Sequence, residues 1–427
     1  MINVRELSNG IKVVIETVPN VRSVALGIYV RCGSAYENER NNGISHMIEH
    51  MMFKGTSKRT AKELARETAL LGDDMNAYTS KEITCFYARV LDEHLPAITE
   101  LLSDMFLHSV FFEEDLEREK SIILDEIDMY DDAPEDLVQE QIQKLVWKEH
   151  PLGYIISGTK ENVLRITRQE LYEYWKKYYV AENMIISIAG NIDERTAFDL
   201  MEKYFAEIPR ENSSLTMTDQ WKAGIIPPHY ASGKDYFDKD TEQVHLCLGY
   251  PGISHDAPEN HTLAILNNII GGSSCSRLFQ QIREDKGLCY SIYSYGSSYS
   301  CTGTYQIYAA MGEENVKAVY NGIMDVIKEL RMHGPTSDEM EQTISQIRSE
   351  LLLARENTHN RMHNNARNLL YRNRIISVDE TMEGLLKVTR NDIYDFMDRY
   401  LDSTLVSVTM AGNFSECAEL QSIFNLF

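Results

Sequence analysis

The distribution of apolar residues predicts strands in the first part of the chain. Segments 11–18 (IKVVIETV) and 23–32 (SVALGIYVRC) are rich in β-branched residues. Because only a short turn with Pro19-Asn20 separates them, the pattern predicts a pair of adjacent strands. Segment 75–79 (MNAYT) alternates like a strand, and 184–189 (MIISIA) predicts a strand that ends the first half.

Helical periodicity dominates the rest. Four intervals repeat apolar residues with a period near 3.6 and predict helices: 95–107, 113–130, 316–333 and 336–371. Capping-box spacings at Thr60 with Glu63 and at Thr167 with Glu170 mark two further helix starts. Strands, then helices, then a closing strand predict an α+β fold with helices packed on a largely antiparallel sheet.

The chain contains an internal repeat. Segment 166–192 aligns without a gap with 388–414, and the same offset of 222 residues places Leu26-Gly27 on Leu248-Gly249. Two separate windows that share one offset indicate two homologous halves. We therefore expect domains at 1–210 and 233–427, joined by a linker at 211–232 that contains Pro227-Pro228 and little periodicity.

The net charge and the composition restrict the classes of molecule that this protein is expected to bind. The 427 residues carry a net charge of −23, so we expect neither nucleic acid nor an anionic membrane as a partner, and basic partners are easier to attract. The apolar runs are far shorter than the ~20 residues that a membrane helix needs. Seven scattered cysteines without a C-x-x-C pair, and an N-terminus without a signal-peptide pattern, predict a cytoplasmic protein.

Residues 46–50 form an H-x-x-E-H motif in a segment of apolar character. Positions i, i+3 and i+4 share a helix face, so His46 and His50 can direct two imidazoles at one ion, with Glu49 between them. Histidines on an ordinary amphipathic helix can show the same spacing. The pentapeptide alone therefore leaves a metal site and a structural role both open.

A catalytic zinc needs a third protein ligand and an open position. Glu119 and Glu126 are seven residues apart, hence on one helix face, and both are candidates. A solvated acidic helix with i,i+4 salt bridges is the alternative reading of this segment. Only the first half carries the H-x-x-E-H motif, because at the repeat offset its three positions are Asn268, Gly271 and Gly272.

Together these residues resemble the M16 metallopeptidases, the family of pitrilysin, insulin-degrading enzyme and mitochondrial processing peptidase. H-x-x-E-H is followed, after residues 51–125, by the Glu126 of E-R-E-x-x-x-I-x-x-E-I, and the inverted motif order is the inverzincin signature. The resemblance covers nearly the whole chain and is closest to the short bacterial branch similar to the processing peptidase β-subunit. Further matching segments are 41–56, 75–90 and 271–291.

The resemblance implies the LuxS/metallohydrolase-like M16 fold and a zinc metalloendopeptidase that hydrolyses unfolded peptides. It implies one Zn²⁺ per chain, held by His46, His50 and Glu126. Glu49 matches the general base of the family. Glu119 matches a glutamate that supports the site from behind the ligands.

The resemblance also implies how substrate is bound. Asn76 and Ala77 lie on a segment that resembles an edge strand pairing with an extended peptide, which the acidic charge predicts to be basic. Arg283 and Tyr290 match a pair that contacts substrate at the reacting centre. One chain supplies half of the family's chamber, so we expect a homodimer, and a heterodimer with a sister subunit also fits.

Two positions depart from the family pattern. Gly72 is followed by Asp73-Asp74 where paired glycines are common, and Cys275 occupies a stretch that often holds small residues or Met. Three other functions fit parts of the sequence: a non-catalytic M16-like partner subunit, a different metal-dependent hydrolase, and a peptide-binding protein with a structural metal. The retained motif residues argue against the first, and three ligands instead of four against the last.

Overall fold

The computed structural model describes residues 2–72, 74–210 and 228–414, and contacts divide the chain into two compact units. Neither unit is a contiguous half of the sequence. Unit 1 consists of Met1–Ile127, Tyr154–Ile226 and Leu353–Ile375. Unit 2 consists of Asp128–Gly153, Pro227–Leu352 and Ile376–Phe427.

Unit 1 contains a six-stranded mixed sheet. Its strand order is β1 (Ile2–Glu6), β2 (Lys12–Thr17), β6 (Met184–Gly190), β3 (Ser23–Val30), β5 (Thr84–Leu91) and β4 (Met75–Thr79). β2 and β6 are parallel, and all other neighbours are antiparallel. The predicted pairing of 11–18 with 23–32 is wrong, because β6 lies between these strands. The seven residues of β6 are all buried, as expected of an apolar strand in the middle of a covered sheet.

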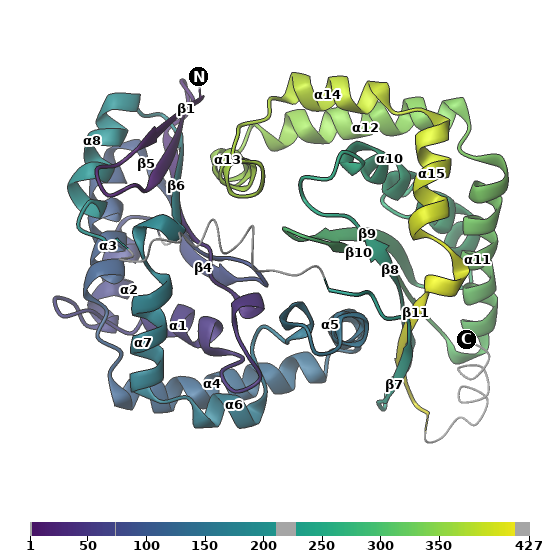
Figure 1. Ribbon diagram of the computed structural model, residues 1–427, viewed down its shortest axis with the longest axis horizontal. Helices are drawn as coiled ribbons and strands as arrows, with labels where there is room; N and C mark the ends of the chain where they lie inside the picture. Colours follow the sequence, from purple (N-terminus) through teal and green to yellow (C-terminus); the bar gives the residue numbers. More distant parts are fainter. Residues whose placement is uncertain (1, 73, 211–227, 415–427) are drawn as a thin grey trace. The chain divides into compact units, whose positions relative to one another are not determined.

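Both faces of this sheet are covered, because successive side chains point to opposite faces. On β3, Leu26 and Ile28 join the main core, whereas Tyr29 joins a second cluster on the other face. That second face is covered by α13 (Thr358–Arg372), which is seen end-on in Figure 1.

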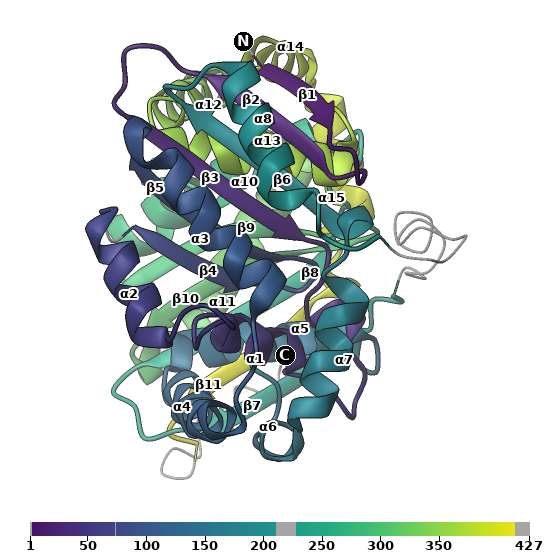
Figure 2. The same ribbon diagram turned by 90° about the vertical axis from the view of Figure 1, so that its left-hand side faces the viewer.

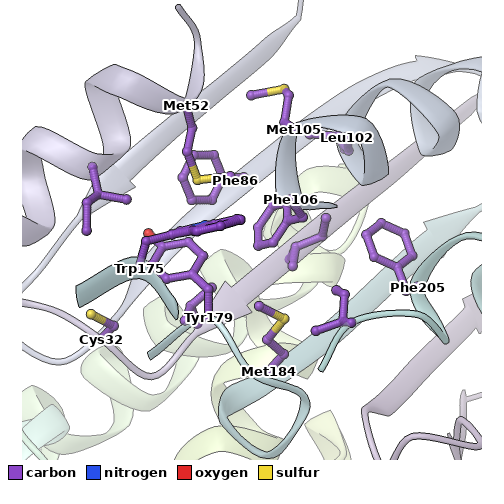
Figure 3. Packing of buried hydrophobic residues seen from close by; sticks show 14 of the residues in the cluster. Cys32, Met52, Phe86, Leu102, Met105, Phe106, Trp175, Tyr179, Met184 and Phe205 are labelled. Atoms are coloured by element: carbon purple, nitrogen blue, oxygen red, sulfur yellow. The ribbon is translucent and has the colours of Figure 1, made fainter. Parts of the chain in front are cut away.

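The main core of unit 1 lies under a layer of helices. Figure 2 shows α2, α3 and α8 in front of the sheet. Phe86 of β5 packs edge-to-face on Phe106 of α3, with ring centroids 5.2 Å apart, and Tyr179 lies against both (Figure 3). Burial of such a side chain stabilises the fold by roughly 1.5–3 kcal/mol. The helices are α1 (Ile44–Met52), α2 (Ala61–Leu70), α3 (Leu95–His108), α4 (Glu113–Asp131), α6 (Lys160–Arg165), α7 (Arg168–Tyr178) and α8 (Glu194–Phe205).

Unit 2 repeats this plan with a five-stranded mixed sheet. Its order is β7 (Lys234–Asp238), β11 (Ser407–Gly412), β8 (Val244–Gly252), β10 (Gly303–Met311) and β9 (Ser291–Ser298). One face is covered by α5 (Pro134–Trp147), and α11 lies on the other side of the sheet in Figure 1. The remaining helices are α10 (Asn260–Ile270), α11 (Val316–His333), α12 (Ser337–Ala354), α14 (Val378–Lys387) and α15 (Arg390–Tyr400). The α+β fold class is confirmed.

The repeated glycines explain how each sheet accepts a helix from the other half of the sequence. A Cβ on Gly27 would lie 2.5 Å from the sulfur of Met362 in α13, and one on Gly249 would lie 2.9 Å from Ile142 in α5. Equivalent hydroxyls hold both helices, since Ser187 donates to the carbonyl of Met362 and Thr409 to that of Val138. The repeat therefore preserves a close helix–sheet contact.

Several local predictions are confirmed and one is wrong. Both capping boxes form, at Thr60 with Glu63 and at Thr167 with Glu170. The predicted helix at 336–371 is instead two helices, because Asn357 is extended and caps the start of α13 with its side chain. Residues 211–227 of the expected linker lie outside the described residues. The division of the chain into two homologous domains, 1–210 and 233–427, stays a prediction from the repeat.

No helix in the described part of the chain combines the length and the apolar character that a membrane crossing requires.

Candidate metal centre

The helix that carries the H-x-x-E-H motif begins at a buried carboxylate. Glu37 accepts hydrogen bonds from the backbone N–H groups of Gly43 and Ser45, each at 2.8 Å, and from the side chain of Asn42 at 2.9 Å. These bonds satisfy the free donors at the start of α1 and place negative charge at its positive end. Gly43 has φ of 100°, and a Cβ there would lie 2.8 Å from the carbonyl of Ser157, so this turn requires glycine.

Tertiary packing brings together the three predicted ligands. One donor atom from each of His46, His50 and Glu126 lies within 4.8 Å of the others. The Nε2 atoms of His46 and His50 are 3.7 and 3.6 Å from Oε2 of Glu126, beyond hydrogen-bond length. Donors on a tetrahedral zinc with bonds of about 2.0–2.1 Å are about 3.3 Å apart, so the residues fit this ion. Burial, followed by the effect of His50, lowers the pKa of His46 to about 3 and keeps it neutral, the form that binds metals.

Glu119 orients one of these ligands. Its Oε2 is 3.1 Å from Nδ1 of His50, and its Oε1 is 2.6 Å from Nζ of Lys54. Burial alone would raise the pKa of Glu119, but the hydrogen bonds of His50 and Lys54 outweigh burial and lower it. A carboxylate accepts from Nδ1–H, so Nε2 of His50 is left to face Glu126.

Glu49 lies on the same helix and is held by the edge strand. Oγ1 of Thr79, in β4, donates to Oε2 of Glu49 at 2.6 Å. Burial raises the pKa of Glu49, while the hydrogen bond from Thr79 and the nearby His50 oppose that rise. The site thus combines a carboxylate whose pKa is raised by burial with three converging side chains of the kind that bind metal ions.

The predicted substrate residues of unit 1 lie on β4, the terminal strand of the sheet. Asn76 is exposed, and its side chain accepts from the backbone N–H of Ala77 at 2.8 Å. Ala77 packs partly against the core. Alternate residues of such a strand present free N–H and C=O groups at the open edge, so the position suits pairing with a peptide.

The other two predicted residues belong to unit 2. Tyr290 is 67 % exposed, and its backbone N–H donates to the carbonyl of Ala310 at 2.9 Å. The guanidinium of Arg283 lies 4.6 Å from the ring centroid of Phe279. Both side chains are accessible within their unit.

Comparison with known proteins identifies the family. Residues 12–160 match the model of Insulinase (Peptidase family M16), and 165–347 match that of the Peptidase M16 inactive domain. A Bacillus subtilis (strain 168) protein named uncharacterized zinc protease YmxG is 38% identical over 407 residues, 95% of this chain and 97% of the relative. The chain belongs to peptidase family M16. This M16 chain is also 28% identical to the mitochondrial-processing peptidase subunit beta of Saccharomyces cerevisiae, over 96% of this chain and 91% of that protein.

Solved structures of similar fold support the architecture. A Helicobacter pylori protease has a TM-score of 0.88 at 18% identity, covering 96% of this chain and 99% of that one. The structure described as a peptidase M16 inactive domain from Pseudomonas fluorescens also has a TM-score of 0.88, at 19% identity, covering 96% and 98%. At these identities the likeness concerns the M16 fold alone.

Sequence reasoning missed three residues that support the motif: Glu37, Lys54 and Thr79. Lys54 lies four residues after His50 and Thr79 ends the predicted strand, so both had a weak local signal in the sequence. Glu37 had none, because its role depends on a turn that returns to the start of α1.

Proposed function

We propose that the chain is a zinc metalloendopeptidase that hydrolyses peptide bonds in unfolded peptides. The observation that carries the proposal is the cluster of His46, His50 and Glu126 beside the buried carboxylate of Glu49. Membership in M16 and relatives that bear the name zinc protease support it.

In this proposal, each residue of the metal site has a role in the reaction that is consistent with its contacts. His46, His50 and Glu126 would hold one Zn²⁺, which when bound acidifies water and polarises the peptide carbonyl. Glu49 takes the proton of the attacking water and passes it to the leaving amine. Glu119 fixes the ring of His50 through Nδ1.

Substrate binding follows from the open edge of β4. An extended peptide adds to this strand by main-chain hydrogen bonds along Asn76 and Ala77, which requires little of its sequence. In a homodimer, Arg283 and Tyr290 of one chain would supply donors for the oxyanion of the carbonyl that reacts at the metal site of the other chain. The net charge of −23 favours basic peptides.

The same proposal covers assembly and compartment. We assign a homodimer, with a heterodimer formed with a sister subunit as the alternative; one relative carries the word subunit in its name. Light scattering of the purified protein distinguishes a homodimer from a monomer awaiting another chain. No disulfide joins any of the six described cysteines, which supports a reducing compartment such as the cytoplasm.

The test uses a basic, internally quenched peptide and protein with one bound zinc per chain. We expect cleavage by the zinc-loaded protein, loss of cleavage after chelation and its return when zinc is restored. If the zinc-loaded protein cleaves no member of a broad peptide library near neutral pH, the proposal fails. The non-catalytic partner subunit is then the better description.

A variant of Lys54 tests how the ligand His50 is supported. In Lys54→Met, Oε1 of Glu119 loses its 2.6 Å partner, so the carboxylate is free to turn away from Nδ1 of His50. We expect zinc affinity to fall about 10-fold or more, measured by competition with a chromophoric chelator. Lys54→Arg should recover most of the affinity, and Lys62→Met, an exposed lysine on α2, should not change it. Unchanged affinity in Lys54→Met would show that Glu119 needs no second partner.

A further inference from the structure

The candidate base and the candidate peptide-binding strand meet at one hydroxyl. Thr79 is the last residue of β4, and its Oγ1 lies 2.6 Å from Oε2 of Glu49. An ionised carboxylate has no proton to give, so the threonine hydroxyl donates and the carboxylate accepts. O–H···O⁻ bonds of this length are among the stronger hydrogen bonds in proteins.

This hydrogen bond makes the two oxygens of Glu49 different: Oε2 accepts from Thr79, and Oε1 is left to meet a water molecule. Among the described residues, no side chain hydrogen-bonds Oε1 of Glu49, whereas Oε2 accepts from the hydroxyl of Thr79. The backbone of Thr79 makes a further, weaker contribution to the ionised form of Glu49. A carboxylate tied at one oxygen cannot rotate freely. Its other oxygen is therefore presented in a constant direction, as a base that must meet one water requires.

Apart from Glu49, the hydroxyl of Thr79 has one weak hydrogen-bond partner among the described residues. Its second polar neighbour is Oγ1 of Thr84, at 3.4 Å, and that residue donates its own proton to the carbonyl of Cys32 at 2.9 Å. Loss of the Thr79 hydroxyl therefore leaves Thr84 satisfied. The hydrogen bond to Glu49, at 2.6 Å, is therefore the main interaction of this hydroxyl.

Geometry also links Thr79 to substrate. Its side chain lies on the same strand face as those of Met75 and Ala77, which pack toward the main core, and β4 contacts α1 directly. Its backbone belongs to the edge on which a peptide would be aligned. A shift of β4 would therefore move the group that holds the base.

We propose that Thr79 is a positioning residue that holds Glu49 through its hydroxyl and so fixes the base relative to a peptide aligned on β4. This inference rests on the proposed function. Among the described residues, the hydroxyl of Thr79 has Glu49 and Thr84 as its polar neighbours and none of the three metal-cluster residues, so its effect is on the direction of the base and not on metal binding.

The experiment compares three variants of the full chain, each loaded with zinc. Thr79→Val keeps the β-branched shape and removes the hydroxyl, while Thr79→Ser keeps the hydroxyl. Thr17→Val is the matched control, because Thr17 also ends a strand of this sheet and donates its hydroxyl, to the carbonyl of Ile192 at 3.0 Å. For Thr79→Val we expect kcat to fall about 10–100-fold with KM and zinc affinity within about 2-fold of wild type. Thr79→Ser should recover kcat to within about 3-fold, and Thr17→Val should match wild type.

A second readout does not depend on activity. A crystal structure of Thr79→Val should show the Glu49 carboxylate turned away from the position that it has in the wild type. The proposal is overturned if kcat of Thr79→Val is unchanged, if Thr79→Ser is as impaired as Thr79→Val, or if Glu49 keeps its position without the hydroxyl. If the wild type cleaves no peptide, the proposed function fails, and the crystal structures alone then decide whether Thr79 holds Glu49.

Discussion

Replacement of Glu49 by Gln is expected to lower kcat about 10²–10⁴-fold while one zinc stays bound per chain. The amide has nearly the shape of the carboxylate, and its oxygen can still accept from Thr79, so α1 should not be disturbed. What disappears is the ability to take a proton from water. A buried carboxylate with a raised pKa suits that task, because it holds a proton long enough to pass it to the leaving amine.

The measurement is peptide turnover at saturating substrate, together with zinc content for each preparation. Glu114→Gln is the control, since Glu114 is an exposed carboxylate in the first turn of α4 with a side chain that is 89% accessible. It removes the same charge and should leave kcat unchanged. A Glu49→Gln protein that turns over at the wild-type rate would remove Glu49 from the mechanism.

The second large effect concerns stability. Glu16 of β2 is 2% exposed and is one of the buried polar groups that hold α13 against the sheet of unit 1. It accepts from Arg355 at 2.6 Å, from Asn365 at 2.8 Å and from Arg361. Glu16→Ala leaves these donors without their buried acceptor, so we expect a loss of about 3 kcal/mol in the free energy of unfolding of unit 1. The two arginines are partly exposed and can turn to water, which keeps the value at the lower end of the usual range.

Urea unfolding measures this loss, and hydrogen exchange locates it. Amides of α13 should exchange on the order of 10²-fold faster in the variant, because local detachment of the helix becomes easier. Glu6→Ala, an exposed carboxylate on β1 of the same sheet, should change stability by less than about 0.5 kcal/mol. Equal stability of Glu16→Ala and wild type would mean that the hydrogen bonds of Glu16 do not stabilise the packing of α13 on the sheet.

The chemistry of the site was predictable because it is local. His46, Glu49 and His50 are placed by the pitch of one helix, and Glu119 and Glu126 by the pitch of another. The spacing of residues within each helix does not indicate that α1 and α4 lie side by side. Before the structure, only the resemblance to M16 connected the two helices. The contacts of Glu37, Lys54 and Thr79 depend on how turns and strands fold back on those helices.

The order of the strands in the sheets was harder to predict from the sequence than the residues of the site. The short turn that contains Pro19-Asn20 predicts two adjacent strands, yet the strands on either side of it are separated by β6. β6 begins at Met184, far along the chain from β2 and β3, so no local pattern in 11–32 could place it between them; all seven of its residues are buried. The break before α13 was missed because one Asn cap interrupts an otherwise continuous periodicity.

The sequence by itself determined the helix and strand pattern, the repeat, the family and the residue types at the metal cluster. These properties follow from periodicity and short spacing, which the chain carries without reference to its fold. Only the tertiary structure decided that each sheet is covered by a helix from the other half, and that a threonine on an edge strand hydrogen-bonds Glu49. Both depend on contacts between segments far apart in the chain, where free energy of packing, and not local preference, selects the partner.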